Sequence, residues 1–405
     1  MSPGNSPMLS LRGWSLDRHS AAGPRTVLDS IDLDLHAGRW LAVIGANGSG
    51  KSSLLKYLAS EDSPLADQAA IMFQDPDDQI FATGVDREIT LGRTGRDAEA
   101  VRQEFGLEGL GEMNPRLLSA GQKQRLVLAV ALGDSPQVLL CDEPTSLQDP
   151  GQAQWVLDRL DRWRHDSGGA LVTATCDRAE AARADEILVL AEGKILAHGP
   201  VAELLDDPRV VELLGSGRPF DAAPPASGDT TGEPVLTLND VGCEFTSGGG
   251  LAGINLTVRP GDRWGLTGVN GCGKSTLLAL CAGARRPDRG TAVLAGQSLY
   301  RQPGLDLDHG RALLAPQFPE YLFTRSDVTA EIALDPALAA QSPEAFLAAL
   351  GLAREVEHSN PHDLSCGQRR RLALGLVLLS NRPLILLDEP TAALDAAGQE
   401  RVLRL

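Results

Sequence analysis

Cationic residues are few in this chain of 405 residues: 37 Lys and Arg stand against 54 Asp and Glu, so the formal net charge is −17. Such an acidic balance disfavours non-specific electrostatic binding to nucleic acid or anionic lipid, and any phosphate has to be held by a local site. Long apolar runs are also missing, because pieces such as residues 372–379 fall short of the roughly 18 residues that cross a bilayer. We therefore expect a chain without a membrane span.

Paired cysteines and a secretory leader are missing as well. The six cysteines are scattered without a CxxC pair, which favours reduced thiols over a disulfide framework or a zinc site. The chain starts Met-Ser-Pro-Gly-Asn-Ser-Pro, with neither the basic region nor the apolar core of a signal peptide. We expect a cytosolic chain that is not secreted.

What the chain does have is an internal repeat. Residues 45–52 (GANGSGKS) return as residues 268–275 (GVNGCGKS), and residues 118–125 (LSAGQKQR) return as residues 364–371 (LSCGQRRR). Residues 140–145 (LCDEPT) return as residues 386–391 (LLDEPT), at the same offset as the second pair. We expect two similar domains, residues 1–220 and 235–405. Residues 221–234, rich in Pro, Gly and small polar residues, are the expected flexible linker.

The hydrophobic pattern predicts an α/β fold in each half. Apolar runs at residues 40–44 and 264–267 are predicted strands that lead into the glycine-rich segments, and helices follow at residues 53–58 and 276–280. Residues 138–141 and 384–387 are predicted buried strands. Such alternation favours a mainly parallel sheet in each domain.

The glycine-rich segments have the spacing of a phosphate-binding loop. Glycines let backbone N–H groups curl around phosphate oxygens, a lysine adds positive charge, and the following serine can coordinate Mg²⁺. For one copy, a tight turn beside a surface lysine is the alternative, and the second copy in a matched context argues against it. The predicted nucleotide-binding residues are Gly45, Asn47, Gly48, Gly50, Lys51, Ser52, Ser53, Gly268, Asn270, Gly271, Gly273, Lys274, Ser275 and Thr276.

Two adjacent carboxylates end a predicted apolar strand in each half. The first of each pair suits the Mg²⁺ shell, and the second, Glu143 or Glu389, can polarise a water that attacks the γ-phosphate. In isolation such an ending could be a turn with solvated charges, but each pair follows an LSxGQ segment at the same distance. The predicted Mg²⁺ ligands are Ser52, Asp142, Ser275 and Asp388.

Together with the LSxGQ segments and the glutamines Gln74 and Gln317, these motifs resemble the ATP-binding cassette (ABC) ATPases over nearly the whole chain. The resemblance implies two tandem P-loop NTPase domains, each with a mainly parallel sheet and a helical signature subdomain. It also implies two MgATP sites between the halves, where Gln74 and Gln317 sense the γ-phosphate. The signature residues of one half would face the nucleotide of the other: Ser119, Gly121, Gln122, Ser365, Gly367 and Gln368.

The segments that follow these glutamines, residues 74–81 and 317–323, look like those of the energy-coupling-factor (ECF) branch, whose ATPases drive vitamin and metal-ion uptake. That resemblance implies transmembrane partner subunits, bound through these segments, and a peripheral place at the cytoplasmic face of the cell membrane. The alternative is a proline-broken loop with a packed phenylalanine.

Both halves depart from the family pattern in places. Cys176 stands where the family has a switch histidine, and we hypothesise slow hydrolysis at the Lys51 site because a thiol is a weak hydrogen-bond donor. The first half is shorter between Lys51 and Gln74 by about one hairpin, and the second half stops before the switch position. Phe245 lies where the family places an adenine-stacking aromatic, or it belongs to the core.

The expected function is ATP binding and hydrolysis that power an ECF-type uptake transporter, with two unequal sites. One alternative is a cytosolic tandem ABC protein acting on ribosomes or nucleic acid, which the acidic balance and short linker disfavour. An ATPase subunit of another transporter and a non-hydrolysing, ATP-gated interaction module are further alternatives. The expected cofactors are ATP and Mg²⁺.

Overall fold

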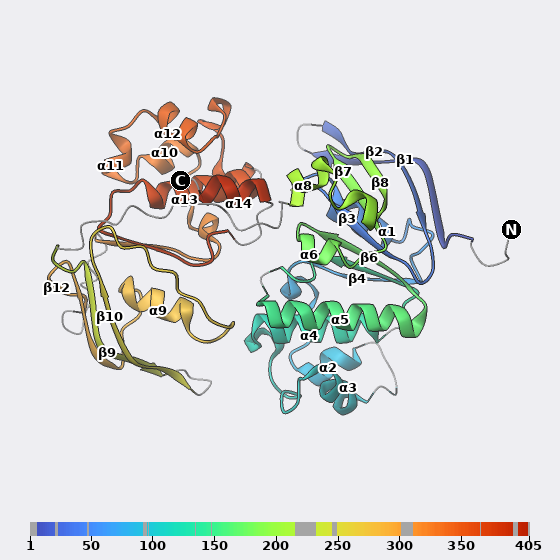
Figure 1. The fold of residues 1–405 in the computed structure, drawn as a ribbon, viewed down its shortest axis with the longest axis horizontal. Coiled ribbons are helices and arrows are strands. Elements are labelled where there is room, and N and C mark those ends of the chain that lie inside the picture. Colours follow the sequence, from blue (N-terminus) through green and yellow to red (C-terminus); the bar gives the residue numbers. More distant parts are fainter. Residues whose placement is uncertain are drawn as a thin grey trace. The chain divides into compact units, whose positions relative to one another are not determined.

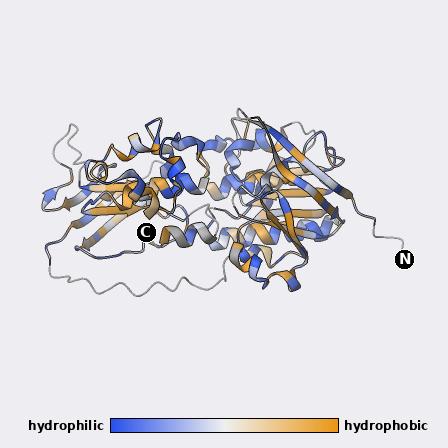
Figure 2. Cartoon of the chain, turned by 90° about the horizontal axis from the view of Figure 1, so that it is seen from above, coloured by the Kyte–Doolittle hydropathy of each residue, from blue (hydrophilic) through white to orange (hydrophobic). Residues whose placement is uncertain are grey.

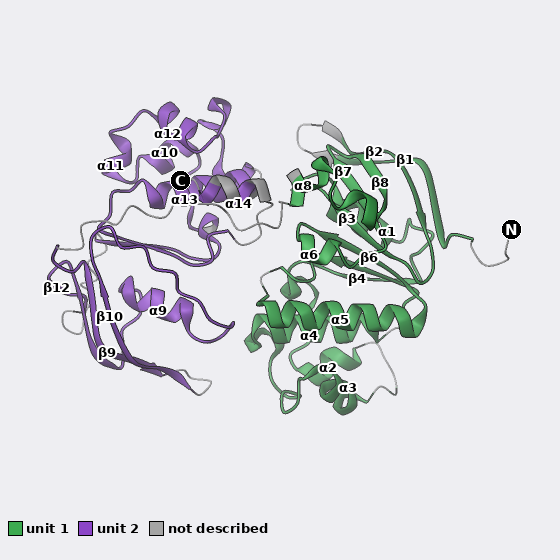
Figure 3. Cartoon of the chain, in the orientation of Figure 1, with its two compact units in different colours: residues 1–218, 395–397 green, residues 219–394, 398–405 purple. Residues whose placement is uncertain are grey.

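The computed structural model describes residues 6–20, 23–46, 48–91, 95, 97–133, 135–146, 148–214, 232–244, 249–300, 311–364, 366–391 and 396–403 (Figure 1). The chain divides into two compact units, residues 1–218 with 395–397 and residues 219–394 with 398–405 (Figure 3). Most of the predicted linker, residues 221–231, lies outside the described residues, as do Asn47, Phe245 and Ser365.

Unit 1 is built on a six-stranded sheet in the order β4-β5-β6-β3-β7-β8. All neighbours are parallel except β8, which runs antiparallel to β7. The strands are Ala69–Met72 (β4), Val138–Asp142 (β5), Ala170–Thr175 (β6), Trp40–Ile44 (β3), Glu186–Ala191 (β7) and Lys194–Pro200 (β8). Every residue of β3, β5 and β6 is buried, as expected for parallel strands covered on both faces. The predicted mainly parallel sheet is confirmed in this unit.

Two apolar cores cover the two faces of this sheet. Leu41 and Val43 of β3 pack with helix α1 (Lys51–Leu58) and with the antiparallel pair β1 (Leu9–Ser20) and β2 (Gly23–Leu35). Ala42 and Ile44 face the other core, with helices α4 (Ala120–Leu132) and α5 (Pro150–Ser167). The period-2 alternation of a strand therefore divides β3 between both cores, and Figure 2 shows the apolar residues gathered in the strands of this unit.

Shorter helices complete unit 1. They are α2 (Val85–Thr90), α3 (Ala98–Phe105), α6 (Arg178–Ala181), α7 (Val201–Leu204) and α8 (Pro208–Leu214), with single 3₁₀ turns at Pro76–Gln79 and Pro115–Leu117. Buried side chains of α2, α3 and α4 pack in the same apolar cluster as those of α5.

Unit 2 has two separate sheets. One is antiparallel, in the order β10-β9-β11-β12: Gly250–Val258, Leu236–Glu244, Arg289–Leu294 and Gln297–Ser298. The other pairs β13 (Ala312–Ala315) with β14 (Leu384–Leu387) in parallel. In the described part of unit 1, β1 pairs only with β2 and nothing corresponds to β11 and β12, in line with the shorter spacing between Lys51 and Gln74.

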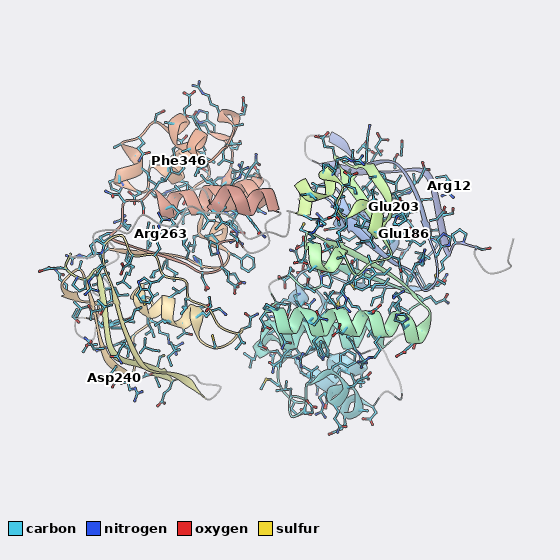
Figure 4. All side chains as sticks on the ribbon, viewed as in Figure 1. Arg12, Glu186, Glu203, Asp240, Arg263 and Phe346 are labelled. Carbon is cyan, nitrogen blue, oxygen red and sulfur yellow. The ribbon has the colours of Figure 1, made fainter. Side chains whose placement is uncertain are left out.

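The helices of unit 2 include α9 (Lys274–Cys281), α13 (Cys366–Leu378) and α14 (Ala396–Leu403). The small helices α10 (Val328–Ile332), α11 (Pro336–Ala339) and α12 (Pro343–Ala349) enclose a core centred on the buried ring of Phe346, labelled in Figure 4. Single 3₁₀ turns lie at Pro319–Leu322, Arg354–Val356 and Pro361–Asp363. In the parts of both units that the structure describes, no helix combines the length and apolar character that crossing a bilayer requires.

The strand predicted at residues 264–267 is wrong. Residues 262–269 are irregular, and the Trp264 side chain is 64% exposed, whereas its counterpart Trp40 begins β3 and is 1% exposed. β3 is held between β6 and β7, whereas residues 262–269 pair with no strand among the described residues. Without a neighbour on either side, backbone groups of this segment have no ladder to join.

Candidate functional site

The glycine loop of unit 1 closes around its own lysine. Lys51 begins α1, and its buried ammonium group donates hydrogen bonds to the carbonyl oxygens of Gly45 (2.7 Å) and Ala46 (3.2 Å). A Cβ added at Gly45 would lie 2.3 Å from the Leu190 carbonyl oxygen, and Gly50 has a φ of +107°. The loop therefore needs glycine at both positions, and its lysine stands at the N-terminus of a helix, which favours anions.

Asp142 and Ser52 bring two oxygen donors together beside that lysine. Asp142 is the buried last residue of β5, and the Ser52 hydroxyl hydrogen-bonds to it. Burial raises the pKa of Asp142, while the Ser52 hydrogen bond and the Lys51 charge act in the opposite direction. A hydroxyl and a carboxylate are ligands that suit Mg²⁺ when phosphate oxygens complete the shell, so the predicted pair fits that ion.

Glu143, the residue after Asp142, has a left-handed backbone conformation. Its φ is 48°, its N–H donates to the Ala174 carbonyl oxygen (2.8 Å), and its Oε2 accepts a hydrogen bond of 2.8 Å from Gln74 Nε2. A non-glycine residue with positive φ costs on the order of 1–3 kcal/mol and persists only where the surroundings hold it. The structure thus brings the two predicted catalytic side chains of this half into direct contact.

Cys176 completes the group at the end of β6. Its sulfur lies 3.8 Å from Glu143 Oε1 and 3.8 Å from the Gly45 carbonyl oxygen. The thiol is therefore between the glutamate and the glycine loop, at the place where the resemblance leads one to look for a histidine. Slow hydrolysis at this site stays a prediction.

Unit 2 repeats the arrangement with more open surroundings. The Lys274 ammonium donates to the carbonyl oxygens of Gly268 (2.9 Å) and Val269 (3.2 Å), and Gln317 Nε2 donates to Glu389 Oε2 (2.8 Å). Glu389 again has a positive φ, 46°, as does Gly273 before the helix. The other predicted loop residues, Gly48, Ser53, Asn270, Gly271, Ser275 and Thr276, lie in the loops and first helical turns, and Asp388 directly follows β14.

The signature segments cap helices within their own units. Ser119 is the N-cap of α4: its hydroxyl accepts from the Gln122 N–H (3.3 Å), and Gln122 Oε1 accepts from the Ser119 N–H (3.0 Å). Such a capping box satisfies two free donors at a helix start. Gly121 lies in the first turn of α4, and Gly367 and Gln368 lie in that of α13. Their predicted role toward a nucleotide on the opposite half stays a prediction.

Two buried polar residues near the Asp-Glu strand of unit 1 escaped the sequence reasoning. Gln124 on α4 donates a hydrogen bond of 2.9 Å to the carbonyl oxygen of Pro144, the residue that follows Glu143. Glu180 on α6 is fully buried and accepts from the Thr145 hydroxyl (2.7 Å), and burial raises its pKa to about 8. A glutamate in a four-residue helix resembles a solvated surface residue, so no local signal could have found it.

Comparison with known proteins finds a matching family model and several relatives. A family model described as ABC transporter matches residues 28–146 and 251–392. An uncharacterised ABC transporter ATP-binding protein of Mycobacterium tuberculosis is 33% identical over 96% of this chain and 56% of its own length. The chain thus spans little more than half the length of that curated relative.

Two further relatives carry different transport names. A peptidoglycan transport ATP-binding protein of Agrobacterium fabrum is 28% identical over 98% of this chain and 85% of its own length. An energy-coupling factor transporter ATP-binding protein of Mycoplasma mobile is 29% identical over 53% of this chain and 88% of its own length. The predicted tandem repeat and its fold class are confirmed by the two matched segments.

Proposed function

Because the chain belongs to the ABC transporter family, we propose that it binds MgATP at both phosphate loops and hydrolyses it to power a membrane transporter. The supporting observation is the same in both units: a loop lysine held by two carbonyl oxygens, beside a glutamate that accepts a 2.8 Å hydrogen bond from a glutamine. This pairs a cation for phosphate oxygens with a carboxylate held in place for a water.

The proposed chemistry is in-line attack by water on the γ-phosphate. Lys51 and Lys274 exchange their carbonyl partners for phosphate oxygens, and Glu143 and Glu389 accept a hydrogen bond from the attacking water. Each glutamine amide holds one carboxylate oxygen, Oε2, of its glutamate and so fixes how the carboxylate is turned toward an incoming water. Ser52 with Asp142, and Ser275 with Asp388, would hold Mg²⁺, which would neutralise charge on the phosphates.

The two sites are proposed to be unequal. In unit 1, the Cys176 thiol lies 3.8 Å from Glu143 Oε1. A thiol donates only weakly, so a water between Glu143 and a γ-phosphate is less well ordered there than beside an imidazole. Turnover at the Lys51 site is therefore slower.

The transporter is proposed to be of the ECF type, with transmembrane subunits that contact the segments after Gln74 and Gln317. Phe81 is 77% exposed and Leu322 is 57% exposed, which supports an apolar contact at both segments. Phe323, in contrast, is buried among α10 and α12, as the packed-phenylalanine alternative holds. The proposal places the chain at the cytoplasmic face of the cell membrane.

Phosphate release from MgATP tests the enzymatic part. Purified chain should hydrolyse ATP, and the double variant Glu143→Gln/Glu389→Gln should bind nucleotide without release. An equal rate in wild type and double variant contradicts hydrolysis at these glutamates.

Co-purification from detergent-solubilised membranes tests the transporter part. Membrane proteins of an uptake system should be retained by the chain and lost with Phe81→Ser/Leu322→Ser, while Leu117→Ser, an equally exposed residue of unit 1, serves as the control. Recovery of ribosomes or nucleic acid in place of membrane proteins overturns it.

A further inference from the structure

Arg370 of α13 is a buried arginine that the proposed mechanism does not use. Its side chain is 1% exposed, and it forms an ion pair with the buried Glu320 at 3.2 Å. The same guanidinium donates to the Gln317 carbonyl oxygen and lies 5.5 Å from the centre of the Phe318 ring. All of these contacts are with the short segment that begins at Gln317.

Burying such a pair is expensive. Each ion loses its hydration, and the mutual attraction returns that cost only in part. Glu320 Oε2 lies 3.2 Å from the Arg370 guanidinium and accepts no hydrogen bond among the described residues. A buried ion pair that loses its hydration is better explained by the position in which it holds residues 317–320 than by a gain in stability.

Gln317 is therefore held both at its backbone and at its side chain. Arg370 holds its carbonyl oxygen, and its side-chain amide reaches Glu389 at 2.8 Å. We propose that Arg370 is a positioning residue that sets Gln317 against Glu389 and thereby ties residues 317–320 to the signature helix α13. For its effect on turnover this inference rests on the proposed function, whereas the positioning itself does not.

The signature helix of unit 1, α4, makes different contacts from those of α13. The residue that corresponds to Arg370 is Gln124, which donates to Pro144, the residue after Glu143, and not to the segment at Gln74. The charge pair that links Asp77 of this segment to α4 uses Lys123 at 2.7 Å, and Asp77 is half exposed to water. In unit 1 the signature helix thus contacts the residue after Glu143 through Gln124 and the segment after Gln74 through the more exposed Lys123 pair, whereas in unit 2 the buried Arg370 contacts the segment that begins at Gln317.

Hydrogen–deuterium exchange on the full chain tests the positioning without any need for turnover. In Arg370→Gln, which introduces the side chain found in unit 1, the peptide covering residues 316–323 should exchange about tenfold faster than in wild type. Arg369→Gln, one position earlier on the same helix, is the matched control and should leave this peptide unchanged. Equal exchange in Arg370→Gln and wild type overturns the inference.

Removing one partner of a buried pair also threatens the fold, so a second variant is needed. Arg370→Gln/Glu320→Gln removes both charges, and it should keep wild-type exchange in α9 and α12 while residues 316–323 still exchange faster. Wild-type exchange at residues 316–323 in the double variant shows that only the unpaired charge mattered and overturns the inference.

A double-mutant cycle with Gln317→Ala extends the test to hydrolysis. If Arg370 acts through Gln317, Arg370→Gln should reduce kcat in the wild-type background, with little change in KM, and add nothing to Gln317→Ala. Additive losses contradict the positioning role. Absence of any hydrolysis by wild type contradicts the proposed function alone, because the exchange result stands independently.

Discussion

The two phosphate loops have nearly the same sequence and lie in different surroundings. Lys51 and Lys274 each hold two carbonyl oxygens of their own loop, so local sequence is enough to set that geometry. The strand before the loop forms only in unit 1, where β6 and β7 flank Trp40. Trp264 has no such neighbours and is largely exposed. The comparison teaches that the loop is a local structure, whereas its support comes from strands distant in the sequence.

Matched tryptophan substitutions give the largest expected difference between the units. Trp40→Ala should lower the free energy of unfolding of unit 1 by about 3–5 kcal/mol, since a fully buried indole is lost. Trp264→Ala should change that of unit 2 by less than about 0.5 kcal/mol, because the ring is already mostly in water. Urea unfolding followed by circular dichroism measures both, and similar losses would break the comparison.

Glu180 makes the stability of unit 1 depend on pH. Its pKa is raised from 4.5 to about 8 by burial, so the folded state favours the protonated form. The contribution of the protonated Glu180 side chain to the stability of the folded state is fully present below pH 4.5 and is lost as pH rises toward 8. Glu180→Gln should therefore gain on the order of 3 kcal/mol relative to wild type between pH 5 and pH 8. Glu203→Gln, at an exposed position of α7 (Figure 4), is the control and should show no such trend.

Substituting the lysine of each phosphate loop compares how much the two sites contribute to ATP turnover. In the full-length protein, Lys274→Ala should reduce phosphate release by about 10²-fold, and Lys51→Ala by less than about tenfold, because the Lys51 site is the slower one. Lys194→Ala, on an exposed strand residue, should have no effect. Equal losses in the two loop variants count against unequal sites.

Restoring an imidazole in unit 1 has the smallest expected effect. In a Lys274→Ala background, Cys176→His should raise the remaining turnover several-fold, because its ring reaches the region between Glu143 and the glycine loop. Cys176→Ser keeps a small side chain and should not do so. A rise of the same size in both variants would show that the thiol merely obstructs the site.

Sequence reasoning succeeded where the signal is local. The glycine loops, the helices that begin at Lys51 and Lys274 and the strands that lead into the two Asp-Glu pairs were all predictable, since each depends on a short pattern. It failed at Trp264, because a strand requires neighbours that no local pattern reveals. The burial of Glu180 and Arg370 could not be foreseen either, as it depends on tertiary packing.

The central claim is that both lysine loops hold a nucleotide, and equilibrium dialysis with radiolabelled ATP and Mg²⁺ tests it most directly. The account predicts two nucleotides bound per chain, one in Lys51→Ala or Lys274→Ala, and none in the double variant. Undiminished binding by the double variant would contradict it.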